Sequence, residues 1–102
     1  MRRYTTPTNR LVVKGKDLTG TDVYVTYSQG NGAGRIVRSI EAETVTFDGE
    51  DTEVTVSLSQ LETARFSVGS CSVQVNWIVD GKRNATTIAQ VPVEANLLEE
   101  EL

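Results

Sequence analysis

The sequence of 102 residues contains no histidine, one cysteine and two prolines. Without histidine, catalysis by a serine or cysteine that needs a histidine base is excluded, and so is zinc held by histidine. The single cysteine, Cys71, excludes an internal disulfide, CxxC redox chemistry and a cysteine-based zinc site. Apolar runs reach only three residues, as at 11–13, whereas a transmembrane helix needs about 20. We therefore expect no metal, no cofactor and no membrane partner.

The sequence also lacks the excess of positive charge that nucleic-acid binding requires. The net charge is −4, so generic nucleic-acid binding lacks its electrostatic basis. The opening residues have no apolar stretch of the kind that a signal peptide needs, so none is expected. Taken alone, these features predict a soluble module and do not indicate its function.

The charges that are present lie unevenly along the chain. Residues 1–16 carry five basic side chains and no acid, whereas residues 94–102 carry four glutamates and no base. Either both ends are simply solvated, or complementary ends steer assembly with a partner or another copy. The candidate contact residues are two arginines and two tyrosines, with three glutamates as their counterpart: Arg2, Arg3, Tyr4, Tyr24, Glu99, Glu100 and Glu101.

β-Branched residues dominate the rest of the sequence. Valine, threonine and isoleucine make 31 of 102 residues, which favours strands over helices. Strands are predicted at 10–14, 22–29, 35–40, 44–47, 52–58, 70–80 and 83–93, with tight turns at the two Asp-Gly pairs. The spacing of Ser59 and Glu62 predicts a capping box and one helical turn over 60–65.

About seven short strands and one helical turn predict an all-β, antiparallel two-sheet Ig-like sandwich, with a small barrel as the alternative. The chain divides into an extended N-terminal arm (1–8), the sandwich (9–95) and an acidic C-terminal tail (96–102). The arm is either disordered or a contact element.

The alternation predicts which side chains face the core. Tyr24 lies on the face opposite the inward side chains of its strand, where it could contact a partner. Inward positions are expected at Val23, Val25, Tyr27, Val54, Val56, Leu58, Cys71, Val73, Val75, Trp77, Val79, Ala85, Ala89, Val91 and Val93, and Leu61 and Ala64 form the core side of the helical turn.

Two features could suggest chemistry, and neither is specific. The glycine loop at 30–34 leads into a predicted strand, so it lacks the helix that a phosphate loop needs. The acids at 48–53 lie on a hairpin turn and do not match calcium-loop spacing. No nucleophile, base and oxyanion donor come together, so we expect no enzyme activity.

Three stretches give the chain a family resemblance. They are MRRYTTPT at 1–8, VYVTYSQ at 23–29, and VTVSLSQLET at 54–63 followed by VQVN at 73–76, Asp80-Gly81 and VPVE at 91–94 before Leu97-Leu98. Their order resembles a family of small phage and prophage proteins of Gram-positive bacteria, and also Ig-like modules of phage tails and baseplates. The chain departs from that pattern at LSQLE (58–62), at Asn76 where a basic residue is common, and in its glycine loop.

The resemblance implies a non-enzymatic structural or assembly protein of a phage, present in the bacterial cytoplasm during assembly or in the virion. Its expected partners are other phage structural proteins or copies of itself in a homo-oligomer. It implies no catalytic or binding residues. The alternatives are a carbohydrate- or cell-surface-binding sandwich and a soluble host-directed binder.

Overall fold

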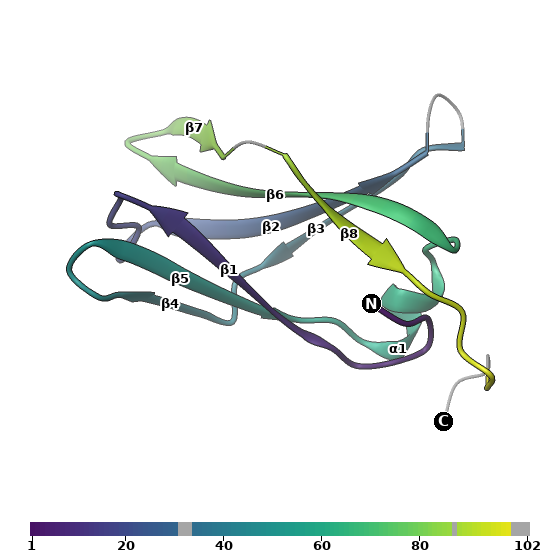
Figure 1. Ribbon diagram of the computed structural model, residues 1–102. Helices are drawn as coiled ribbons and strands as arrows, with labels where there is room; N and C mark the ends of the chain where they lie inside the picture. Colours follow the sequence, from purple (N-terminus) through teal and green to yellow (C-terminus); the bar gives the residue numbers. More distant parts are fainter. Residues whose placement is uncertain (31–33, 87, 99–102) are drawn as a thin grey trace.

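The computed structural model describes residues 1–30, 34–86 and 88–98, which form two antiparallel sheets and one short helix (Figure 1). The elements are β1 (Thr8–Lys14), β2 (Asp22–Gln29), β3 (Ile36–Glu41), β4 (Thr44–Phe47), β5 (Asp51–Ser57), α1 (Gln60–Ala64), β6 (Gly69–Val79), β7 (Lys82–Ala85) and β8 (Ala89–Val93). One sheet has the order β1-β5-β4 and the other β3-β2-β6-β7, with β8 also paired to β6. The predicted two-sheet sandwich is confirmed, and the sheets do not close into a barrel.

The inner faces of the two sheets meet in one apolar core. Its buried members are Val13, Leu18, Val23, Val25, Tyr27, Val54, Val56, Leu58, Phe66, Cys71, Val73, Val75, Trp77 and Val93. The alternation predicted for β2, β5 and most of β6 is therefore confirmed. Val79, at the end of β6, is 39% exposed, so the predicted inward face ends at Trp77.

Both Asp-Gly pairs form the predicted turns. Val79 pairs with Lys82 across a two-residue loop in which Asp80 and Gly81 both have positive φ, at 51° and 74°. Positive φ at both central residues defines the hairpin turn that matches the twist of the strands. In the other turn, Asp48 Oδ1 accepts hydrogen bonds from the backbone N–H groups of Glu50 and Asp51.

The strand predicted at 83–93 is divided in two by one extra residue. Asn76 pairs with Ala85, and Val73 pairs with Ala89. These two pairs are three residues apart along β6 but four residues apart along the facing chain. One extra residue in a strand moves the following side chains to the other face. Ala85 therefore lies beside Asn76 on the outer face, and its predicted inward position is wrong. Ala89 keeps the inner register opposite Val73 but is exposed.

The chain changes sheet between β3 and β4. The N–H of Ala42 donates to the Val23 carbonyl in β2 at 2.9 Å, and the N–H of Glu43 donates to the Thr55 carbonyl in β5 at 2.8 Å. Consecutive residues thus bond to different sheets, as at the corners of sandwiches. We call this side, formed by β3, Ala42-Glu43 and β4, the corner flank, and the opposite side, between β1 and β7–β8, the open flank.

The helix begins where the sequence predicts, but a different side of it faces the protein interior. Ser59 and Glu62 form the capping box. Leu61 is 56% exposed and Ala64 half-buried, whereas Thr63 is buried, so the predicted core side is wrong. The apolar side chain at this end comes from Phe66 beyond the helix, whose ring centroid lies 5.9 Å from that of Tyr27. A helix of five residues is too short to have an apolar stripe of its own.

Candidate functional site

The N-terminal residues, predicted as an arm, pack on the domain. Arg3 donates from Nε to the Phe66 carbonyl at 2.7 Å and from Nη2 to the Ala64 carbonyl at 2.9 Å. Ala64 is the last residue of α1, where backbone acceptors lack helical partners, and Phe66 lies two residues beyond it, so Arg3 caps this end of the helix. The N–H of Thr5 donates to Thr63 Oγ1, which in turn donates to the Thr5 carbonyl. The arm is therefore ordered against the helix.

The two charged ends of the chain meet at Arg2. Its Nη2 lies 3.0 Å from Glu94 Oε2, and its Nη1 donates to the Ala95 carbonyl at 2.8 Å. The backbone joins in, because Glu94 N–H donates to the Met1 carbonyl and Arg3 N–H donates to the Glu94 carbonyl. Part of the predicted complementarity is thus satisfied within one chain. Glu99, Glu100 and Glu101 lie outside the described residues.

The two candidate tyrosines lie in different places. Tyr4 is half-buried in the arm at a positive φ of 57°, with the Arg3 guanidinium 5.5 Å from its ring centroid. Tyr24 points from β2 to the outer face of the larger sheet, as predicted, opposite Asn76. There it lines a hollow of about 260 Å³ with Asn76 and Arg83. No described contact joins the two tyrosines.

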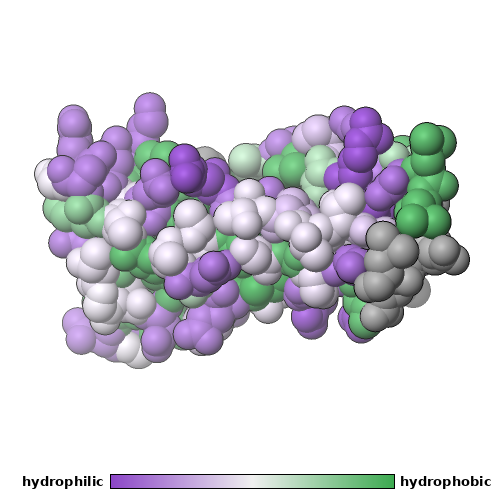
Figure 2. All heavy atoms as spheres, turned by 90° about the horizontal axis from the view of Figure 1, so that it is seen from below, coloured by the Kyte–Doolittle hydropathy of each residue, from purple (hydrophilic) through white to green (hydrophobic). Residues whose placement is uncertain are grey.

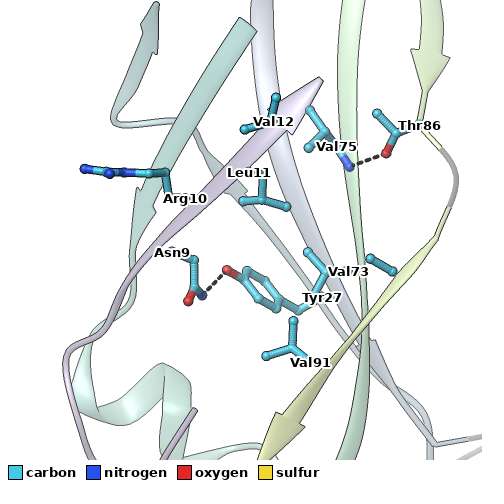
Figure 3. A pocket seen from close by; sticks show the side chains of 10 residues that line it. Asn9, Arg10, Leu11, Val12, Tyr27, Val73, Val75, Thr86 and Val91 are labelled. Carbon is cyan, nitrogen blue, oxygen red and sulfur yellow. Dashed lines mark hydrogen bonds between the residues drawn. The ribbon is translucent and has the colours of Figure 1, made fainter. Parts of the chain in front are cut away.

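The open flank contains a groove that sequence reasoning missed. It has a volume of about 400 Å³ and runs between β1 and the return strands β7–β8 (Figure 3). Its lining is mostly apolar: Asn9, Arg10, Leu11, Val12, Tyr27, Val73, Val75, Thr86, Ala89 and Val91. No local signal could have found it, because its walls come from strands that meet only in the folded chain. At its lower end in Figure 1 the arm residues join β8 at the Arg2–Glu94 bridge.

Two hydrogen bonds join polar groups inside the groove. Asn9 Nδ2 donates to the Tyr27 hydroxyl at 2.6 Å, and the Val75 N–H donates to Thr86 Oγ1 at 3.1 Å. Burial raises the pKa of the Tyr27 hydroxyl, so this group stays neutral near pH 7. Arg10 is the one charged residue among the described residues of the lining, and its Nε lies 3.3 Å from Glu53 Oε1. The groove suits an apolar ligand with a small number of polar or acidic contacts.

The strand beside the groove has an unpaired edge. Within the described part of the chain, β1 pairs with β5 and with no other strand. The N–H of Leu58 donates to the Pro7 carbonyl, and these two residues face each other in the register that pairs β1 with β5. In an antiparallel pair every second residue is hydrogen-bonded to the facing strand, so Asn9, Leu11 and Val13 bond to β5. The backbone N–H and C=O groups of the alternate residues, from Thr8 to Lys14, therefore point away from β5 toward the open flank.

The remaining candidates give no reactive site. Cys71 is a free, buried thiol whose pKa is raised by burial, as expected for an inert cysteine. Among the described residues, no three acidic or cysteine side chains come together to hold a metal ion. Three residues of the glycine loop, 31–33, lie outside the described part of the chain. Within that part, no helix has the length and hydropathy to span a membrane.

The face seen from below Figure 1, where the smaller sheet lies, is mostly hydrophilic or intermediate (Figure 2). Its apolar surface is broken into short stretches, so this face offers no broad apolar contact. The groove and the edge of β1 are the strongest candidate contact site. Comparison of the chain with protein-family models, curated proteins and solved structures finds no match.

Proposed function

We propose that this chain is a non-enzymatic structural or assembly protein of a phage or prophage that acts through protein–protein contacts. The observation that supports a contact role most strongly is the apolar groove beside the unpaired edge of β1. Edge strands with free backbone groups are sites where another chain can add a strand. The phage assignment comes from the sequence resemblance of the stretches at 1–8, 23–29 and 54–94.

The partners proposed are other phage structural proteins or copies of the chain itself. Assembly would take place in the bacterial cytoplasm, with the virion as the destination. The test is mass spectrometry of purified particles after prophage induction in the source strain. Stoichiometric presence supports the proposal, and the copy number relative to the major capsid protein indicates shell, ring or fibre. Absence from particles and from immature assemblies would contradict it.

A second candidate function is binding of a carbohydrate at the outer face of the larger sheet. Tyr24 supports it, because an aromatic ring beside Asn76 and Arg83 in a shallow hollow could stack on a sugar. Glycan-array binding that is lost in Tyr24→Ala and kept in Tyr4→Ala would favour this function over assembly. If no glycan on the array is bound, assembly remains as the single proposed function.

A further inference from the structure

We propose that the groove of the open flank receives an extended segment of another protein as an added strand on β1, with apolar side chains directed inward and a carboxylate directed at Arg10. This inference rests on the proposed assembly function and specifies the contact. It commits to a partner segment that is extended, acidic and apolar at alternate positions. The proposed contact has a backbone part, a side-chain part and a charge part.

The backbone part follows from the register of β1. Because Leu11 and Val13 bond to β5, the N–H and C=O groups of Arg10 and Val12 point outward. In a β-ladder each such residue can exchange two hydrogen bonds with a facing residue. An added strand would therefore extend the order β1-β5-β4 by one strand, placed over the groove. A compact ligand would leave these backbone groups unused.

The side-chain part follows from the faces of β1. An added strand places alternate side chains beside Asn9, Leu11 and Val13, on the inner face of the sheet. That face looks into the groove, whose apolar lining includes Leu11, Val73 and Val91 (Figure 3). Apolar residues at positions one, three and five of the segment would fill this space. The pattern is the one that the core strands of this chain show themselves.

The charge part favours a different protein over a second copy of this chain as the partner. On the outer face, the edge of β1 presents Arg10 and Lys14 at alternate positions around Val12. If two copies paired their β1 edges about a two-fold axis, Arg10 would lie opposite or diagonal to a cation of the other copy in every register that places it opposite a residue of β1. Like charges in these positions are destabilising, and basic residues on an edge oppose self-pairing.

A carboxylate opposite Arg10 is favourable for the same reason. Only the Nε of Arg10 is engaged, by Glu53, and its side chain is 73% exposed. Its two Nη groups have no hydrogen-bond partner among the described residues, so they can hold a carboxylate in a bidentate pair. None of the described residues that line the groove is acidic. The fitting partner therefore carries an acid between two apolar residues.

The experiment uses the full chain and a short synthetic peptide in which valine alternates with glutamate and threonine. Binding is measured by titration calorimetry, and amide hydrogen exchange of the complex is followed by NMR. We expect exchange at Arg10, Val12 and Lys14 to slow at least about tenfold, because their N–H groups become bonded. Leu11 and Val13 are already bonded to β5 and should not change.

Matched variants separate the three parts. Val12→Pro removes an outward N–H and should abolish binding, whereas Val12→Thr keeps it. Ala89→Trp fills the groove, and Ala85→Trp places the same side chain on the outer face. Arg10→Glu should weaken binding about tenfold or more, whereas Arg83→Glu on the outer face should not. Circular dichroism confirms that each variant is folded.

Several results would overturn the proposal. Equally tight binding of a peptide with lysine in place of glutamate would contradict the assignment of a carboxylate to Arg10. Protection of Val12 in the free chain that grows with protein concentration identifies a second copy as the occupant. Protection that is independent of concentration identifies the chain's own residues as the occupant. Unchanged binding by both Val12→Pro and Ala89→Trp excludes this site.

Particle analysis separates this inference from the proposed function. A chain that enters particles but binds no peptide through β1 keeps the assembly function and loses the strand-addition site. A chain that binds the peptide through β1 but never enters particles or immature assemblies keeps the site and loses the phage function. Incorporation of the Val12→Thr chain together with exclusion of the folded Val12→Pro chain supports both.

Discussion

The two flanks of the sandwich connect its two sheets in different ways. At the corner flank the chain itself passes from one sheet to the other, and Ala42 and Glu43 bond to β2 and β5. An ion pair of 3.0 Å between Arg38 in β3 and Glu62 in α1 further links this flank to the helix. At the open flank no strand crosses, and the sheets are joined within the described residues mainly by the arm at its lower end and by the Asn9–Tyr27 hydrogen bond.

The difference shows where a two-sheet fold remains open to a partner. A flank closed by the chain has its sheet-to-sheet hydrogen bonds in place, so a partner there would have to displace them. The open flank offers unused backbone groups and apolar side chains that are already side by side. Substitutions that act on one flank and spare the other test this distinction.

The largest effect is expected from the core that both flanks share. Phe66 is fully buried against Tyr27 near the base of the groove, so Phe66→Ala should lower the free energy of unfolding by about 3–5 kcal/mol. Urea unfolding followed by fluorescence measures the change. Val68→Ala, at a position 62% exposed two residues on, is the control and should cost little. Equal costs would show that the core is not placed as described.

Proline should distinguish the flanks directly. Ala42→Pro removes the N–H that bonds to Val23, and we expect a loss of about 2–3 kcal/mol. Val12→Pro removes an N–H that points to solvent on an edge strand, and the loss should stay below about 1 kcal/mol. Thermal unfolding of both variants gives the comparison. A large loss in Val12→Pro would mean that the open edge is already paired.

Acid should weaken the corner flank first. Burial raises the pKa of the Glu62 carboxyl, but hydrogen bonds from Ser59 and Arg38 outweigh burial and hold it below 4.5. The folded form therefore gains stability from Glu62 above that pH and loses it as the pH falls through the lowered value. Relative to Glu62→Gln, the wild type should lose stability as the pH falls from about 5 through the lowered pKa of Glu62. Parallel pH profiles of the two proteins would exclude the effect.

The smallest effect concerns the end of the open flank. The Arg2–Glu94 pair is more than half exposed on both sides, so Arg2→Ala should cost about 0–1 kcal/mol, and less at high salt. Arg3→Ala should cost more, because it removes two charge-assisted bonds to the carbonyls that end α1. Chemical denaturation at low and high salt separates the two arginines. A larger loss in Arg2→Ala would reverse their roles.

Features set by neighbouring residues were predictable from the sequence. The bounds of β2 and β4 agree with the prediction, and the Asp-Gly turns and the Ser59–Glu62 capping box form as expected. Each depends on side-chain alternation or on a backbone preference within a few residues. The same holds for Tyr24, whose outward position follows from the buried residues on either side of it.

Features set by distant residues were missed. The extra residue between Ala85 and Ala89 is defined only by the register against β6, so the inward position of Ala85 was predicted wrongly. Leu61 is exposed because Thr63 faces the arm and Phe66 fills the core. The groove depends on which strand lies at the edge of each sheet, and composition and periodicity carry no information on that order.

The position of β1 has a consequence for synthesis on the ribosome. Its partners in β5 follow it by 37 residues at Lys14–Asp51 and by 49 residues at Thr8–Ser57. At about 5–20 residues per second, the apolar segment around Val12 waits roughly 2–10 s for its partner strand to be made. Arg10, Lys14 and Lys16 flank that segment and, as gatekeeper charges, discourage nascent chains from associating through it before the first sheet can form.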